Sequence, residues 1–233
     1  MDHDFLWDGP KPPSRGPKPT LTLERIATAG IALADAEGLG AVAMHRVAAE
    51  LGVTKMSLYR YVPGKAELVA LMAEHAIGAP PELPATGWRP GLAAWARSLL
   101  GAYLAHPWAL EATVGPRPVG PVELTWLECA LRVLADTPLT GPERLDTVAV
   151  LAGHTRGIAQ QASAGRNPEA DLTTAIAAPL ARHGDRFPQL LSALAATGDA
   201  GAGDQAFEFG LTLILDGAER RMATQAPTAS GHS

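Results

Sequence analysis

The sequence predicts an all-α protein, in which an N-terminal three-helix domain of the helix-turn-helix type is followed by a helical bundle. From residue 22 almost to the end, apolar residues recur at the i, i+3, i+4 spacing of an amphipathic helix. No run alternates polar and apolar residues between turn signals, as a strand would, and no repeat of about 20–50 residues is present. With 233 residues, 47% of them hydrophobic, the chain can build one large domain or two small ones.

The chain begins with a segment that we expect to be a flexible arm, over residues 1–20. Pro10–Pro19 contains five prolines and several basic residues, a composition typical of an extended, solvated segment. The first helix should begin after Thr22, whose hydroxyl can cap it. It should end at Gly38 or Gly40, because glycine commonly terminates helices.

The next three helices are short and closely spaced. Met44–Leu51 carries apolar residues on one helical face, and Gly52 allows a sharp turn after it. Thr54 is a suitable N-cap for a third helix to about residue 62, where a Pro-Gly pair ends it. A fourth helix follows over 65–77. The second helix, the turn and the third helix make a helix-turn-helix.

After a proline-rich stretch the pattern stays helical. Pro107 suits the first turn of a short helix, and Thr140–Glu143 has the spacing of a capping box. The expected helices cover 88–104, a short turn after 107, 121–134, 140–163, 168–182, 187–196 and 204–223. The expected domains are the arm (1–20), the helix-turn-helix domain (21–67), the helical bundle (68–225) and a disordered tail (226–233).

Charge is unevenly distributed along the chain. The net charge of −5 taken alone argues against a nucleic-acid partner. However, Lys11–Lys65 holds eight Lys/Arg and four Asp/Glu, whereas the remainder holds 11 Lys/Arg and 20 Asp/Glu. A basic N-terminal part joined to an acidic body indicates that one end of the molecule meets nucleic acid.

The stretch "LGVTKMSLYRYVPGKAEL" concentrates aromatic and basic residues in a chain that is only 5% aromatic. Tyr59 and Tyr61 could be core aromatics, and Lys65 a solvated helix start. Alternatively, the short third helix enters a DNA groove about 12 Å wide, with the rings packed on the domain and their hydroxyls reaching the backbone. The combination of Leu-Gly-Val, Tyr-x-Tyr and Gly-Lys after an amphipathic helix favours DNA binding.

The segment "LTLERIATAGIALADAEGLGAVAMHRVAAELGVTKMSLYRYVPGKAELVALM" resembles the DNA-binding domain of the TetR (Tet repressor) family of transcriptional regulators. The C-terminal part is similar to the family's ligand-binding and dimerisation domain in "WRPGLAAWARSLLGAYLAHPW", "GPVELTWLECALRVL" and "FEFGLTLILDGAERRMA". The resemblance implies a homodimer that binds a near-palindromic double-stranded operator and releases it when a small-molecule effector binds the body.

The resemblance also implies DNA-contacting positions in this chain. The recognition-helix positions are Lys55, Met56, Ser57, Arg60 and Tyr61, with Thr54 as the cap that begins the helix. Tyr59 and Lys65 match phosphate-contact positions, and His45 stands where the family often has arginine. Ala43 stands where a Ser or Thr N-cap is common, so the second helix departs from the family at two positions.

We find no arrangement of residues that would make the chain an enzyme, and we expect no cofactor and no metal. The seven histidines are scattered without metal-ligand spacing, and no phosphate-binding loop or G-x-S-x-G occurs. Cys129 lies in an apolar helix, which favours packing over catalysis, and a single cysteine excludes an internal disulfide. Since neither a signal peptide nor an apolar run of about 20 residues is found, we expect a cytoplasmic protein without a membrane partner.

Two sets of residues in the body are candidates for binding. Each polar residue of the first set could be a satisfied core or surface residue, but together they indicate that one or two line a cavity for an apolar or aromatic effector. The last helix carries two apolar faces, of which one chain can easily cover only one. The cavity candidates are Tyr103, His106, Trp126, His154 and Arg156. The expected dimer interface is Phe207, Leu211, Ile214, Leu215, Ala218 and Met222, with Phe209 and Leu213 on the second face.

The function that we expect is sequence-specific transcriptional regulation, in the form of a repressor that a small molecule releases from its operator. One alternative is a helical small-molecule-binding or catalytic protein whose helix-turn-helix is vestigial. Another is a DNA-binding protein without a ligand. Salt-dependent binding to one DNA sequence would eliminate the first alternative, and a ligand that changes this binding would eliminate the second.

Overall fold

The computed structural model describes residues 4–8, 21–164, 168–196 and 205–225, and all regular structure in these ranges is helical. The fold class predicted from the sequence is therefore confirmed. The elements are α1 (Asp4–Asp8), α2 (Leu23–Glu37), η1 (Leu39–Ala41), α3 (Met44–Glu50), α4 (Lys55–Tyr59), α5 (Lys65–Ile77), α6 (Trp88–Ala105), α7 (Ala109–Ala112), α8 (Pro121–Val133), α9 (Gly141–Ala164), α10 (Pro168–His183), η2 (Gly184–Arg186), α11 (Pro188–Ala196) and α12 (Gln205–Gln225).

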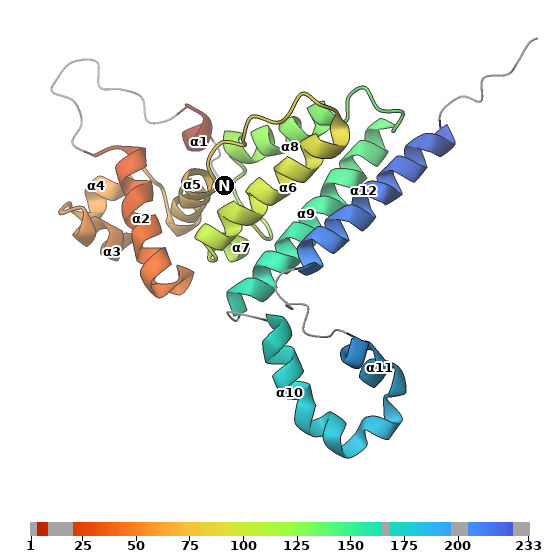
Figure 1. Cartoon of the computed structure of the whole chain (residues 1–233). Coiled ribbons are helices and arrows are strands. Elements are labelled where there is room, and N and C mark those ends of the chain that lie inside the picture. Colours follow the sequence, from red (N-terminus) through yellow and green to blue (C-terminus); the bar gives the residue numbers. More distant parts are fainter. Residues whose placement is uncertain (1–3, 9–20, 165–167, 197–204, 226–233) are drawn as a thin grey trace, which may run out of the picture.

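The helix-turn-helix part is built from α2, α3 and α4, with α5 packed along α2 (Figure 1). The Thr22 side chain accepts a hydrogen bond from the Arg25 amide, as predicted for an N-cap, and Gly38 ends α2 with φ of 82°. Where α2 and α5 cross, a Cβ on Gly30 would lie only 2.7 Å from the Met72 sulfur. Glycine at this position therefore lets the two helices approach closely.

The turn between α3 and α4 needs Gly52, which has φ of 66° and so lies in the left-handed region. The helix after it is shorter than predicted, since α4 ends at Tyr59 rather than near residue 62. Pro63 accounts for the difference, because the residue before a proline is pushed away from helical backbone angles. Leu58 and Val62 are nevertheless fully buried, as expected for the inward face.

The fourth helix, α5, joins the two parts of the chain. It packs against α2 on one side and against α6, α7 and α8 on the other. The expected boundary after residue 67 falls inside this continuous helix, so α5 can transmit displacement between the two parts. The body packs α6 against α8 and α9, and α12 runs beside α9, whereas α10 and α11 project from the end of α9 (Figure 1).

The first helix, α1, is not predicted by the sequence. Phe5 and Leu6 pack against the core, and the Trp7 Nε1–H donates to the Val119 carbonyl at 3.3 Å. The expectation of a flexible arm over 1–20 is therefore wrong for residues 4–8. The rest of that arm, the Gly-rich turn over 197–204 and the tail over 226–233 lie outside the described residues.

Glu143 fastens the start of α9 to the end of α12. Its carboxylate accepts from the amide and hydroxyl of Thr140 at 2.9 and 2.7 Å, which supplies one half of the predicted capping box. It also accepts from Gln225 Nε2 and from Arg221 Nε at 2.7 Å. The bond from Gln225, followed by those from Thr140 and Arg221, lowers the pKa of Glu143 to about 2.

These contacts predict how Glu143→Gln changes acid stability. A carboxyl group whose pKa is lowered by folding stabilises the native state above its unfolded pKa, and this contribution is lost as the pH falls toward about 2. The variant should melt below the wild type at pH 7, and the two melting temperatures should converge as the pH falls from about 4.5 toward 2. Thermal melts across this range provide the measurement, with Glu128→Gln as the control because Glu128 has only a 3.8 Å ion pair. A difference that stays constant with pH would contradict the assignment.

Candidate functional site

The exposed surface of the helix-turn-helix centres on α4. Leu58 faces the core and is fully buried, whereas Lys55, Tyr59 and Arg60 are exposed and Met56 is 74% exposed. An exposed methionine flanked by cations is unusual for a solvated face, and it suits a surface that another molecule covers. The α4 positions expected at DNA therefore share one accessible side of the domain, apart from Ser57.

The α4 N-terminus is fixed by its cap. The Thr54 side chain accepts from the Ser57 amide at 3.2 Å, and the two hydroxyl oxygens lie 2.9 Å apart. This confirms Thr54 as the N-cap and engages Ser57 within the protein. The Lys55 ammonium lies over the Tyr59 ring, 5.5 Å from its centroid, which holds the cation close to the exposed surface.

Three further expected DNA positions surround α4. Tyr61 is half-buried and packs against the core, but Tyr59 is 38% exposed, so the expectation that both rings pack inward is wrong for Tyr59. Lys65 is exposed at the first position of α5, where the N-cap Gly64 offers no side-chain bond. His45 is exposed on α3.

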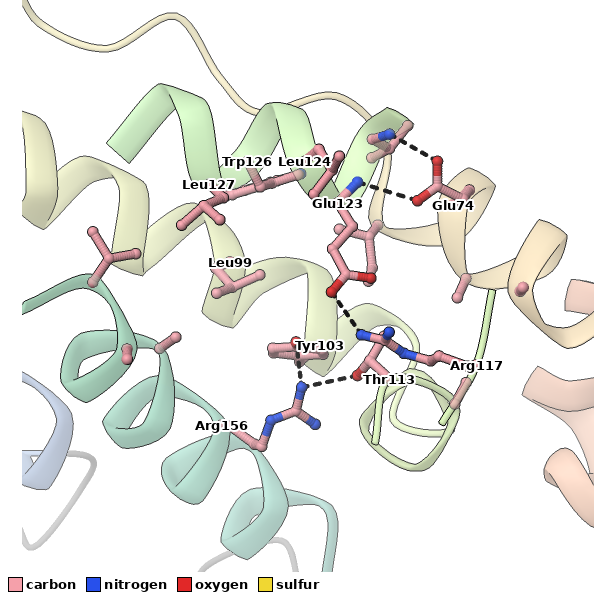
Figure 2. A pocket seen from close by; sticks show the side chains of 18 of the residues that line it. Glu74, Leu99, Tyr103, Thr113, Arg117, Glu123, Leu124, Trp126, Leu127 and Arg156 are labelled. Carbon is pink, nitrogen blue, oxygen red and sulfur yellow. Dashed lines mark hydrogen bonds and ion pairs between the residues drawn. The ribbon is translucent and has the colours of Figure 1, made fainter. Parts of the chain in front are cut away.

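A cavity of about 450 Å³ lies in the body between α5, α6, α8 and α9 (Figure 2). The indoles of Trp95 and Trp126 meet edge to face at 5.8 Å, and both N–H groups donate to backbone carbonyls. These rings therefore present apolar surface. The other apolar side chains in the lining include Leu99, Leu127, Val148 and Ile77.

Among the described residues, two arginines are the cations of the lining, and their partners differ. The Arg117 Nη2 donates to Glu123 Oε1 at 2.7 Å. Arg156 instead donates to neutral oxygens, from Nη2 to the Tyr103 hydroxyl at 3.0 Å and to Thr113 Oγ1 at 2.9 Å, and from Nη1 to the Leu110 carbonyl at 2.8 Å (Figure 2).

A buried carboxylate connects α5 to α8 beside the cavity. Glu74 accepts hydrogen bonds from the amides of Val122 and Glu123, at 2.7 and 3.1 Å, at the N-terminus of α8. Burial raises the pKa of Glu74, and these two bonds oppose the rise. Because α5 continues from the helix-turn-helix, Glu74 ties the cavity wall to the helix that leads to the DNA-facing surface.

The segment 106–113 makes a second connection. Asp35 on α2 accepts from Trp108 Nε1 at 2.6 Å, and its Oδ1 lies 2.9 Å from His106 Nδ1. The same segment supplies the Leu110 carbonyl to Arg156. It therefore contacts the helix-turn-helix domain on one side and the cavity on the other.

Of the five expected cavity residues, Tyr103, Trp126 and Arg156 line the cavity and two do not. His106 is bonded to Asp35. His154 stacks on Phe207 at 5.6 Å, with Nε2 2.9 Å from the Phe207 carbonyl, because it points from α9 toward α12. No sequence pattern singled out the other polar or aromatic lining residues, namely Trp95, Glu74, Thr113, Arg117 and Glu123.

The expected dimer interface on α12 is also wrong in its choice of face. Its members are buried inside the protomer, Ile214 only partly, so they pack against the chain's own helices and are unavailable to a partner. The second face remains open, with Phe209 67% and Leu213 56% exposed. The buried residues are Phe207, Leu211, Leu215, Ala218 and Met222.

A helix-turn-helix joined by one continuous helix to a helical body with an apolar cavity defines a transcriptional regulator. Residues 26–72 match the family described as bacterial regulatory proteins, tetR family, and residues 80–222 match the tetracyclin repressor-like C-terminal domain. The chain therefore belongs to the TetR family, and it is a DNA-binding transcriptional regulator.

Individual relatives agree with this assignment. The chain is 40% identical over 229 residues to the HTH-type transcriptional repressor DrrR1 of Streptomyces coeruleorubidus, covering 93% of this chain and 84% of that protein. The crystal structure of apo ActR from Streptomyces coelicolor has a TM-score of 0.76 at 25% identity, covering 90% of this chain and all of that chain. ActR in complex with actinorhodin has the same TM-score at 26% identity, covering 88% and 99%.

Neither a metal site nor a membrane span is found in the part of the chain that the structure describes. These ranges contain no group of three or more His, Cys, Asp or Glu side chains placed to hold a metal ion. Within them, no helix combines the length and the hydrophobicity needed to cross a membrane.

Proposed function

We propose that this chain is a homodimeric repressor that binds a near-palindromic operator in the bacterial cytoplasm and leaves it when a small molecule occupies the cavity. The observation that carries the proposal is that one helix, α5, connects the exposed α4 surface with the wall of an apolar cavity. The ligand-bound structure of ActR supports it, as a protein of similar fold in complex with a small molecule. We expect no enzymatic activity.

The dimer that we propose forms through α9 and α12. Val150 and Leu213 line a groove between the two helices, and both are more than half exposed. Ion pairs from Arg97 to Glu208 and from Arg89 to Asp216 tie α12 to α6 on its other flank. The remaining apolar face, together with the same face of a second copy, would form an isologous four-helix interface.

In the proposed complex, side chains of α4 read bases and residues around it hold phosphates. Lys55 lies at the first turn of α4, the end of a recognition helix that contacts base edges. Lys65 and Tyr61 lie beyond α4, where a cation or a hydroxyl can position the protein on the DNA backbone without reading sequence. Isolating bound fragments from a random DNA library with the purified chain tests this. An enriched inverted repeat is expected, whereas an unenriched pool would contradict the proposal.

Release would follow from the segment 106–113. A ligand beside Arg156 competes for the side chain that holds the Leu110 carbonyl, and any displacement of this segment pulls on Asp35 in α2. A ligand can release DNA only if it binds the DNA-free arrangement more tightly than the bound one. The two bonds at Asp35 are therefore expected to carry part of that difference.

Asp35→Ala should weaken the ligand's effect while leaving both binding sites in place. Coupling between two sites is commonly about 5- to 150-fold, and the variant should lose most of it because its α2 no longer follows residues 106–113. The measurement is operator affinity with and without a releasing compound found by screening. Glu37→Ala is the matched control, because Glu37 is also an acid of α2 but pairs with Arg46 instead. Full release from the Asp35 variant would contradict this route.

A further inference from the structure

Arg156 is a cation in the cavity without a carboxylate partner among the described residues. Its three hydrogen bonds go to a hydroxyl of tyrosine, a hydroxyl of threonine and a backbone carbonyl. Its guanidinium also lies 5.1 Å from the centroid of the Tyr103 ring. These groups satisfy donors but bring no negative charge, and a guanidinium has five N–H donors to satisfy.

The acids around the cavity are occupied or distant. Glu123 is paired with Arg117, and both oxygens of Glu74 accept backbone amides of α8. Asp146 lies in the lining but is exposed and stands ten residues before Arg156 on α9, about 15 Å along the helix. Within the described lining of the cavity, the positive charge of Arg156 is therefore the unmatched one.

The rest of the cavity is aromatic and aliphatic. Tyr103 lies beside Arg156, and Leu99 follows it along α6 toward Trp126 and Leu127 (Figure 2). A volume of about 450 Å³ falls within the range of about 300–1,000 Å³ that small-molecule sites occupy. A flat ring system fits between the indoles and leaves its edge at the guanidinium.

We propose that the effector is an aromatic acid, a fused-ring molecule with a carboxylate or phenolate that pairs with Arg156. This rests on the proposed function and names the ligand class of its cavity. A planar guanidinium forms charge-assisted hydrogen bonds with an anionic oxygen that are stronger than those with neutral oxygens. The acid therefore draws Arg156 away from Leu110 and Thr113, which connects ligand charge to the segment 106–113.

The test compares anthraquinone-2-carboxylate with anthraquinone-2-carboxamide, which keeps the ring system and removes the charge. Isothermal titration of the full chain should show the carboxylate binding about 10- to 100-fold more tightly. Arg156→Met should abolish this preference, Arg156→Lys should retain part of it, and the exposed-site control Arg132→Met should behave like the wild type. Melting temperatures show whether each variant is folded.

Equal affinity for the two compounds, a preference that survives in Arg156→Met, or no binding of either compound would overturn the proposal. Its failure is distinguishable from failure of the proposed function. If a neutral compound releases the operator and the acid does not bind, the ligand class is wrong and the regulator stands. If the acid binds through Arg156 but operator affinity does not change, the ligand class stands and release by the cavity is wrong.

Discussion

Replacing Phe209 and Leu213 together by aspartate is expected to give a folded monomer that no longer binds its operator specifically. Both side chains are more than half exposed in the protomer, so the substitutions cost the single chain little. In the proposed dimer they would bury four carboxylates that lack partners. A monomer contacts one half-site, and operator affinity should fall by about 1,000-fold or more, to the level of non-specific binding.

Analytical ultracentrifugation at micromolar concentration and operator titration measure this prediction. Leu104→Asp is the control, because Leu104 is 44% exposed on α6, outside the α9–α12 face. It should remain dimeric and bind normally. A double variant that sediments as a dimer, or a wild type that sediments as a monomer, would show that the interface lies elsewhere or does not form.

The second large effect is expected at Lys55. An alanine there removes a long cationic side chain that can donate to guanine O6 and N7, and removing such a bond to a base costs about 1–3 kcal/mol. Since the substitution acts in both half-sites of a dimer, operator affinity should fall by about 30-fold to 10,000-fold. Binding to scrambled DNA should change much less, because bonds to base edges contribute little to it.

Lys65→Ala provides the contrast for Lys55→Ala. Removing a cation from the DNA backbone should weaken binding to operator and scrambled DNA alike, and lower the salt slope by about one unit per phosphate released. Titrations of both variants on both DNAs at several salt concentrations separate the two roles. If Lys55→Ala and Lys65→Ala reduce affinity by the same factor on each DNA, the assignment of base reading to Lys55 is wrong.

The helices were predictable where their ends depend on local chemistry. Thr22 and Thr54 cap α2 and α4 through their own side chains, and Gly52 has the positive φ of the turn that the sequence suggested. The third helix was predicted too long because Pro63 acts on the backbone of the residues before it. The first helix, α1, was missed because five residues before a proline-rich stretch have no periodicity to detect.

The two sites differ in how far the sequence could define them. Most of the residues expected at DNA lie within eleven positions of each other around one short helix, so their shared exposure follows from local pattern. The cavity needs four helices, and a sequence does not give their rotation. His154 and Arg156 are two residues apart, which turns them by about 200° around α9, so one meets α12 and the other the cavity.

The same ambiguity explains the choice of the wrong face on α12. Phe207 and Phe209 also lie about 200° apart, on two apolar stripes of similar strength. A single sequence shows that both need burial but does not show which of them the protomer's own core covers. The structure decides this, with Phe207 buried and Phe209 67% exposed.

Our central claim is that two copies of this chain bind one two-fold operator through α4. A titration of the wild type against the enriched inverted repeat and its scrambled counterpart, with the mass of each complex measured, tests it most directly. We expect two chains per duplex and an affinity at least about 1,000-fold higher for the repeat, falling steeply with salt. Equal affinity for the two duplexes, or one chain per repeat at saturation, would contradict it.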